Sequence, residues 1–244
     1  MYSKTKKIIL LAIILSFVQL LIFSGTSFST IVGSGHDLTP TGGGAFIYDT
    51  SAAEDQVCIF CHTPHKAIVL DSDSNRLPLW NRSISGNEIG FTPYSSSTLN
   101  AAPGQPRSMT LLCLSCHDGT SALNVVQNFQ GGPATFGIIS GTATIGEVPG
   151  LGINIGDSTK DLSNDHPVSF VYDINLRNDD AVNGVFGLND PATISPLRLF
   201  NGRLECATCH NPHEPGTQGL PGSTYPFLRM SNDSSAMCVK CHNK

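Results

Sequence analysis

All eight cysteines of this 244-residue chain lie in four Cys-x-x-Cys-His motifs. The motifs are Cys58-Ile-Phe-Cys61-His62, Cys113-Leu-Ser-Cys116-His117, Cys206-Ala-Thr-Cys209-His210 and Cys238-Val-Lys-Cys241-His242. This pattern is the attachment signal for c-type haem, in which two thiols bond to the porphyrin and the next histidine binds the iron. The sequence therefore predicts four haem c groups, with His62, His117, His210 and His242 as the proximal iron ligands.

Two other uses of paired cysteines compete with this interpretation. Cys-x-x-Cys units occur in zinc knuckles, and eight cysteines in an exported chain can form four disulfides. Neither use requires a histidine directly after every second cysteine. With 8 histidines in 244 residues, four such coincidences arise by chance roughly once in a million. The motif therefore favours haem attachment over both alternatives.

Four histidines remain outside the motifs, which is one for each predicted iron. They are His36, His65, His166 and His213. The match in number predicts four bis-histidine haems with these residues as the distal ligands. Met109, Met230 and Met237 are competing sixth ligands, but we expect them to pack against the haems as apolar side chains.

The order of these histidines repeats along the chain. Each half has one spare histidine, a C-x-x-C-H-x-P-H segment and a further C-x-x-C-H motif. Axial imidazoles on one iron put their Cα atoms about 12 Å apart, whereas three residues span at most about 10–11 Å. His65 therefore cannot share an iron with His62, nor His213 with His210. Each such segment is predicted to serve two irons and to hold two haems close together.

The N-terminus has the features of a secretory signal peptide. Lys4, Lys6 and Lys7 precede an apolar run from Ile8 to Phe23, and small residues follow up to Ser29. We assign residues 1–29 to this peptide; an uncleaved anchor is the alternative. Its removal takes away three lysines and no acidic residue, which lowers the net charge from −5 to −8. A nucleic-acid partner is disfavoured at that charge, and no membrane span is expected in the mature chain.

We expect residues 30–244 to form a single tetrahaem domain, with half-repeats at about 30–130 and 157–244 and a Gly-rich connector at 131–156. The 24 glycines, 15 prolines and few aromatics predict a mostly irregular, loop-rich fold with a haem core, short α-helices and few short β-strands. Short helices are expected at 109–117 and 234–242, with another at 122–128, and a strand at 167–172. Ser51 and Glu54 form a capping box before Cys58.

Several segments resemble the doubled-CXXCH cytochromes, most closely the OmcE-type tetrahaem extracellular cytochromes that polymerise into nanowires. They are Cys-Ile-Phe-Cys-His-Thr-Pro-His, Leu-Pro-Leu-Trp80-Asn-Arg, Leu-Leu-Cys-Leu-Ser-Cys-His-Asp-Gly, Asn-Asp-His166-Pro-Val-Ser-Phe and Leu-Arg-Met-Ser-Asn. The resemblance runs from about Gly35 to His242 and implies a haem chain that continues from subunit to subunit. It also implies that one histidine ligates a haem of the next subunit; His65 is the preferred donor, and His36 in the Gly-rich N-terminal arm is the alternative.

We therefore expect an exported electron-transfer protein and not an enzyme, which acts as the subunit of an extracellular filament. A soluble periplasmic tetrahaem carrier is the first alternative, because such carriers share the motifs. A multihaem reductase is the second, but it needs an iron with an open coordination position, and the histidine count leaves none. The redox donor and acceptor are not indicated by the sequence.

Overall fold

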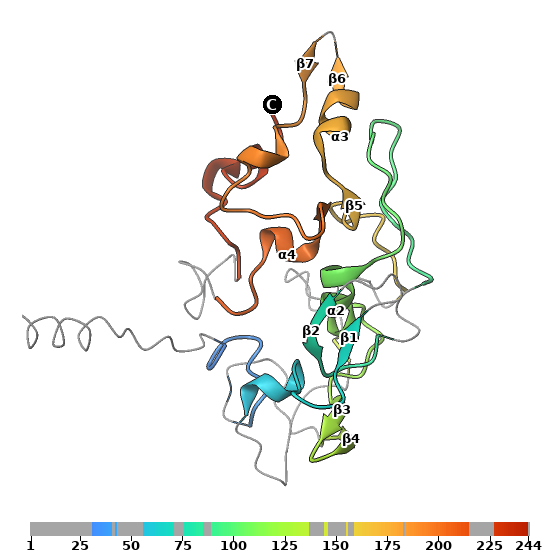
Figure 1. Cartoon of the computed structure of the whole chain (residues 1–244), viewed down its shortest axis with the longest axis vertical. Helices are drawn as coiled ribbons and strands as arrows, with labels where there is room; N and C mark the ends of the chain where they lie inside the picture. Colours follow the sequence, from blue (N-terminus) through green and yellow to red (C-terminus); the bar gives the residue numbers. More distant parts are fainter. Residues whose placement is uncertain are drawn as a thin grey trace, which may run out of the picture.

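Regular structure in this protein is sparse and comes in short pieces. The computed structural model describes residues 31–40, 42, 56–70, 76–84, 89–136, 144–145, 155, 159–182, 184–214 and 227–243. The predicted signal peptide, the capping box at Ser51 and most of the Gly-rich connector lie outside these residues. The longest described helix, α2 (Ser108–His117), has 10 residues. Long loops join the elements (Figure 1), which confirms the predicted loop-rich fold with few short helices and strands.

The first half contains two antiparallel hairpins around α2. A 3-10 turn, η1 (Val57–Phe60), precedes the pair β1 (Ile68–Leu70) and β2 (Arg76–Trp80), and β3 (Val125–Phe129) pairs with β4 (Gly132–Thr135) after α2. The helix expected at 122–128 is wrong, because most of that segment belongs to β3. Gln130 and Gly131 adopt φ values of 51° and 103°, the left-handed pair that closes a two-residue hairpin turn.

The second half is built from equally small elements. They are β5 (Phe170–Val171), α3 (Ile174–Asp179), β6 (Ala181–Val182), β7 (Val185–Phe186), η2 (Pro191–Thr193), β8 (Arg203–Leu204), α4 (Cys206–Cys209), η3 (Asp233–Ser235) and η4 (Cys238–Lys240). Strand β5 lies within the predicted 167–172 strand and pairs with β8. The 234–242 segment forms 3-10 turns in place of one helix, because Ser234 and Ser235 have φ values of 53° and 63°.

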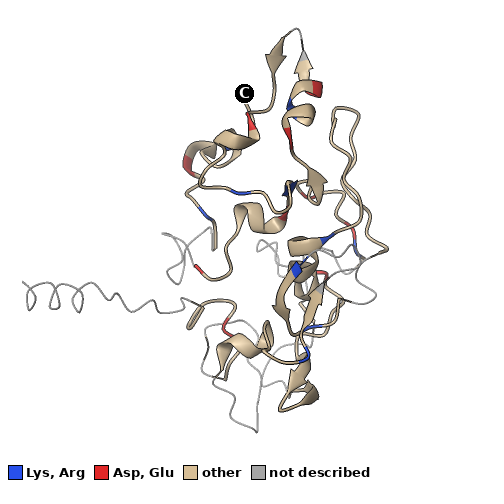
Figure 2. Ribbon diagram, viewed as in Figure 1, with Lys and Arg blue, Asp and Glu red and all other residues tan. Residues whose placement is uncertain are grey.

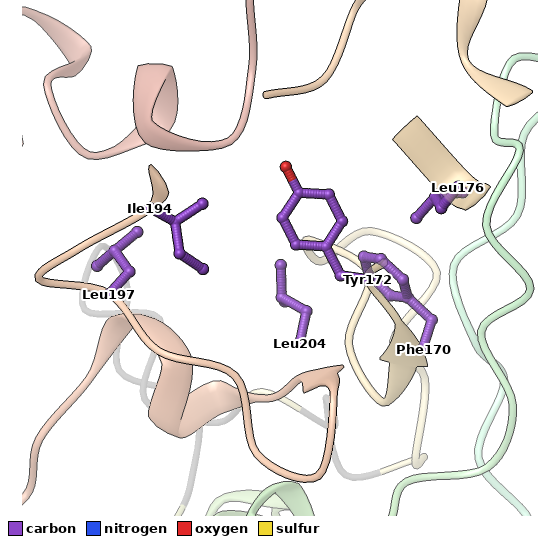
Figure 3. Packing of buried hydrophobic residues seen from close by; sticks show 6 residues of the cluster. All are labelled: Phe170, Tyr172, Leu176, Ile194, Leu197 and Leu204. Atoms are coloured by element: carbon purple, nitrogen blue, oxygen red, sulfur yellow. The ribbon is translucent and has the colours of Figure 1, made fainter. Parts of the chain in front are cut away.

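The described apolar residues form four separate small clusters, and no single core joins them. Phe60, Leu123, Val126, Phe136 and Ile145 make the first. Figure 3 shows the second, in which the Tyr172 ring lies among Phe170, Leu176, Ile194, Leu197 and Leu204. Two smaller clusters surround Trp80 and Phe91. Half-buried cysteines of the motifs border the first three clusters: Cys116, Cys241 and Cys61.

Two buried polar residues after β2 hold the first two motifs in place. The Asn81 side-chain amide donates to the carbonyls of Ile59 (2.6 Å) and Asn128 (3.0 Å), which ties η1 to β3. The Arg82 guanidinium, 3 % exposed, donates to the Leu123 carbonyl at 2.8 Å and to the Ala122 carbonyl. Because buried carbonyls need donors, these bonds fix the chain that leaves α2 and its Cys-x-x-Cys-His motif.

Candidate haem-binding sites

Each Cys-x-x-Cys-His motif folds into one tight helical turn. The histidine N–H donates to the carbonyl of the first cysteine in three motifs: His62 to Cys58 (2.8 Å), His210 to Cys206 (3.1 Å) and His242 to Cys238 (2.9 Å). The remaining motif, Cys113–His117, ends α2. One turn places the first cysteine and the histidine on the same side of the backbone, as a ligand that bonds to all three side chains requires.

The structure brings three of the motif histidines against three of the spare ones. The ring centroids of His36 and His117 are 6.0 Å apart, those of His62 and His213 are 5.9 Å apart, and those of His166 and His242 are 6.3 Å apart. Each pair joins one predicted proximal ligand to one predicted distal ligand. The interplanar angles are 78°, 20° and 72° respectively.

These separations match the distance required by a metal ion between two imidazoles. A bond from a metal to an imidazole nitrogen is about 2.0–2.1 Å long, and the ring centroid lies about 1.1 Å behind that nitrogen. Two rings on opposite sides of one iron therefore have centroids about 6.3 Å apart. Any twist between the planes is compatible with this arrangement, since both rings contain the nitrogen–metal axis. The ring separations of all three pairs thus fit two imidazoles on one haem iron.

Hydrogen bonds and burial hold several of these rings in the form that binds metal. His62 Nδ1 lies 2.5 Å from the Pro78 carbonyl and His166 Nδ1 lies 2.9 Å from the Pro167 carbonyl. A carbonyl only accepts, so Nδ1 carries the proton and Nε2 presents its lone pair. Burial, with His117, His210 and His213 nearby, lowers the pKa of His36 to about 4. Burial also lowers the pKa of His62, although the Pro78 carbonyl opposes the shift. Both rings are therefore neutral at pH 7, as ligation requires.

The spare histidine at position 65 is placed differently. Its side chain is exposed, and within the described part of the chain its ring pairs with no other imidazole. Its backbone is fixed, because the Asn128 side-chain amide donates to the His65 carbonyl at 2.9 Å and to the Thr63 hydroxyl at 3.0 Å. The His65 ring is thus presented at the surface on a rigid segment.

The thiols of consecutive motifs lie close together. The side chains of Cys113 and Cys206 lie next to each other, which brings the second motif against the third. Burial, with Cys116 nearby, raises the pKa of Cys61 to about 12. Burial, with Cys241 nearby, raises the pKa of Cys209 to about 11. Such burial disfavours a thiolate but not a thioether, which carries no charge.

The two competing arrangements of the cysteines are not present in the described residues. All eight cysteines are free, so none is paired in a disulfide. Within the same residues, no three side chains of His, Cys, Asp and Glu converge into a metal-binding group.

The structure adds three contacts that the sequence did not reveal. The Trp80 ring packs edge-on against His62 at 5.7 Å, and the Phe227 ring stacks on His36 at 4.3 Å. Glu205 lies fully buried beside the second and third motifs. The position of Glu205 directly before Cys206 was its only sequence signal, and Phe227 had none.

A comparison with family models finds a doubled CXXCH motif over residues 199–244. The matched segment contains the third and fourth motifs. It marks the chain as similar to multihaem c-type cytochromes. No curated protein sequence matches the chain.

The CXXCH motifs indicate covalent c-type haem, electron transfer and an extracytoplasmic location, because c-type haem is attached outside the cytoplasm. No helix within the described residues is long and apolar enough to cross a membrane. The positions of charged residues are scattered along the described ribbon, with both signs interspersed (Figure 2).

Proposed function

We propose that the chain is an exported tetrahaem c-type cytochrome that conducts electrons, and that it acts as the subunit of an extracellular filament. The three histidine pairs carry the electron-transfer proposal, since each combines a motif histidine with a spare one at a ring separation that suits a six-coordinate iron. Iron held in this way cycles between its ferric and ferrous states. With both axial positions filled, it has no open position for a substrate.

The pairing also explains how the chain would keep its haems in electronic contact. His213 faces His62 but lies three residues from His210, so four residues of backbone would tie the third haem site to the first. The contact of Cys113 with Cys206 ties the second site to the third. Contacts of this kind would hold neighbouring haems at a fixed separation. The protein around them would then change little in structure when an electron passes from one haem to the next.

A spectrum tests the coordination. Four bis-histidine sites predict an entirely low-spin ferric protein whose reduced form binds no carbon monoxide. A substantial high-spin fraction in undamaged protein, together with binding of carbon monoxide or nitrite, would favour the multihaem reductase instead.

The filament proposal rests on the resemblance to polymerising cytochromes and on the surface around His65. The Thr63 N–H donates to the Leu79 carbonyl at 3.0 Å, which places Leu79 beside the His65 segment. Leu79 and Val69 on the β1–β2 hairpin are apolar, yet 47 % and 48 % exposed. An exposed imidazole with apolar residues beside it suits a joint at which His65 ligates a haem of the next subunit.

The His65→Ala variant tests this joint, with Lys66→Ala as the matched control at the neighbouring exposed position. We expect wild type and Lys66→Ala to form long filaments in negative-stain images. His65→Ala is expected to yield monomers or short oligomers in which one haem in four is high-spin. A wild-type protein that runs as a monomer with four low-spin haems would instead identify a soluble periplasmic carrier.

A further inference from the structure

Glu205 is a buried carboxyl group whose two oxygens have very different surroundings. Its side chain is 0 % exposed. Two hydroxyl groups donate to Oε2: Thr110 Oγ1 at 2.5 Å and Ser169 Oγ at 2.8 Å. Oε1 accepts no hydrogen bond within the described part of the chain, while the Thr208 N–H is directed to the Glu205 side chain in a capping box. Since buried polar atoms are nearly always paired, the bare Oε1 is a position for a further proton or ligand.

The surrounding hydrogen bonds fix where an added proton would go. The Arg107 N–H donates to Ser169 Oγ at 3.1 Å, and the Cys206 N–H donates to Thr110 Oγ1 at 3.2 Å. Each hydroxyl has a single proton, and both hydroxyls direct it to Oε2 of Glu205. A proton taken up by the carboxyl group therefore has to reside on Oε1.

The groups around Glu205 act on its two protonation states in opposite directions. Burial raises the pKa of Glu205, while the Thr110 and Ser169 hydroxyls and the Arg203 guanidinium lower it. Arg203 on β8 donates to the Ser169 carbonyl at 3.0 Å, and Arg107 is the residue before α2. The remaining titratable neighbours, Cys113 on α2 and Cys206 on α4, would be uncharged thioethers in the haem-loaded protein.

Glu205 also lies beside two of the proposed haem attachment points. It directly precedes Cys206, whose side chain lies next to that of Cys113. A ferric bis-histidine haem carries one more positive charge than its ferrous form. Charges interact strongly where water is excluded, so loss of that positive charge favours the neutral carboxyl group.

We propose that Glu205 is a redox-linked proton site, which takes up a proton on Oε1 when the haems attached through α2 and α4 are reduced. Oε1 holds one proton, so only one of the two electrons that enter this haem pair is accompanied by a proton, which passes from water to Oε1; removal of that electron releases the proton again. Electron transfer through the middle of the chain is thereby coupled to pH. The inference rests on the proposed haem attachment at Cys113, Cys116, Cys206 and Cys209.

The test is an equilibrium spectroelectrochemical titration of the haem-loaded protein from about pH 5 to about pH 9. Over one pH window, the wild-type potential of the proton-coupled reduction step of this haem pair should fall as pH rises. One proton per electron means a tenfold change in the reduction equilibrium for each pH unit, which is about 59 mV for a one-electron couple. Below the window the carboxyl group is neutral in both redox states, and above it ionised in both, so the potential is constant on either side.

Glu205→Gln should abolish this window and hold the potential at its higher, low-pH value, because the amide resembles the protonated carboxyl group. Asp179→Asn, which neutralises an exposed carboxylate on α3, is the matched control and should keep the window. Ser169→Ala removes a hydrogen-bond donor that stabilises the ionised form of Glu205, so it should move the pH window to higher pH. A variant that acted only by disturbing the fold would not be expected to shift the window in this direction.

Persistence of the window in folded, four-haem Glu205→Gln protein would overturn the proposal, as would its absence in the wild type. If Glu205→Gln does not fold, the protonation of Glu205 can be tested by redox-difference infrared spectra of the wild type and of Ser169→Ala. The C=O stretch of a protonated carboxyl group should appear on reduction, and its absence would refute the site. A protein that carries no haem would refute the proposed function instead, and a haem count by mass separates the two failures.

Discussion

The pairing of His62 with His213 predicts that a change near the third motif will affect the first haem. His213 lies three residues after His210, yet its ring is 5.9 Å from that of His62. His213→Ala should therefore convert the haem attached at Cys58 and Cys61 to a high-spin form and leave the haem at Cys206 and Cys209 low-spin. One haem in four changes, which is measurable by electron paramagnetic resonance.

A variant that lacks the first haem shows which haem is affected by His213→Ala. In a Cys58→Ser, Cys61→Ser variant the first haem cannot be attached, so the addition of His213→Ala should produce no high-spin signal. His166→Ala is the control, because it should give one high-spin haem in four in the normal background and one in three in this one. A high-spin haem caused by His213→Ala in the Cys58→Ser, Cys61→Ser background would refute the pairing.

The same ligation should also stabilise the fold. It would close a loop across the 151 residues that separate positions 62 and 213, and a permanent cross-link of that span contributes about 5 kcal/mol at most. The loss in His213→Ala should be no larger than this value, measured by guanidinium unfolding of the haem-loaded protein. No loss of stability would show that the second half does not hold the first through this ligand.

Two further predictions concern the cofactor content and the core. Each haem adds roughly 0.6 kDa, so the intact mass should exceed that of the processed chain by about 2.5 kDa; a mass equal to the apoprotein plus zinc would contradict the haem assignment. Leu123→Ala should destabilise the protein by about 2–5 kcal/mol, because Leu123 is 2 % exposed in the cluster around Phe60. Val32→Ala, at a position 69 % exposed, should change the unfolding free energy little, and an equal effect of both variants would refute this view of the core.

The sequence predicted which residues form the motif turns better than it predicted the secondary structure between the motifs. Cys-x-x-Cys-His is a local signal, so its turns could be predicted without tertiary information, and the 109–117 helix is present as α2. The expected helix at 122–128 failed because the left-handed pair Gln130–Gly131 reverses the chain and makes Val125–Phe129 a strand. That turn lacks the usual asparagine or aspartate before glycine.

The pairing of the histidines depends on contacts between residues far apart in the sequence. The spacing could exclude His65 as a partner of His62, but it could not single out His213, which lies 151 residues further on. Glu205 was missed for a similar reason. Its burial depends on Thr110 and Ser169, which come from two other segments. The division into half-repeats and the assignment of ligands remain predictions.

The four small apolar clusters bear on how the protein matures after export. Within the described residues, each cluster has three to six buried residues and is too small to fold by itself, since small cores bury too little surface to offset the entropy of the chain. A chain that leaves the translocation channel without haem would therefore stay open to proteases. If haems fill the space between the clusters, we expect haem-loaded molecules to resist proteolysis and haem-free molecules to be degraded after export.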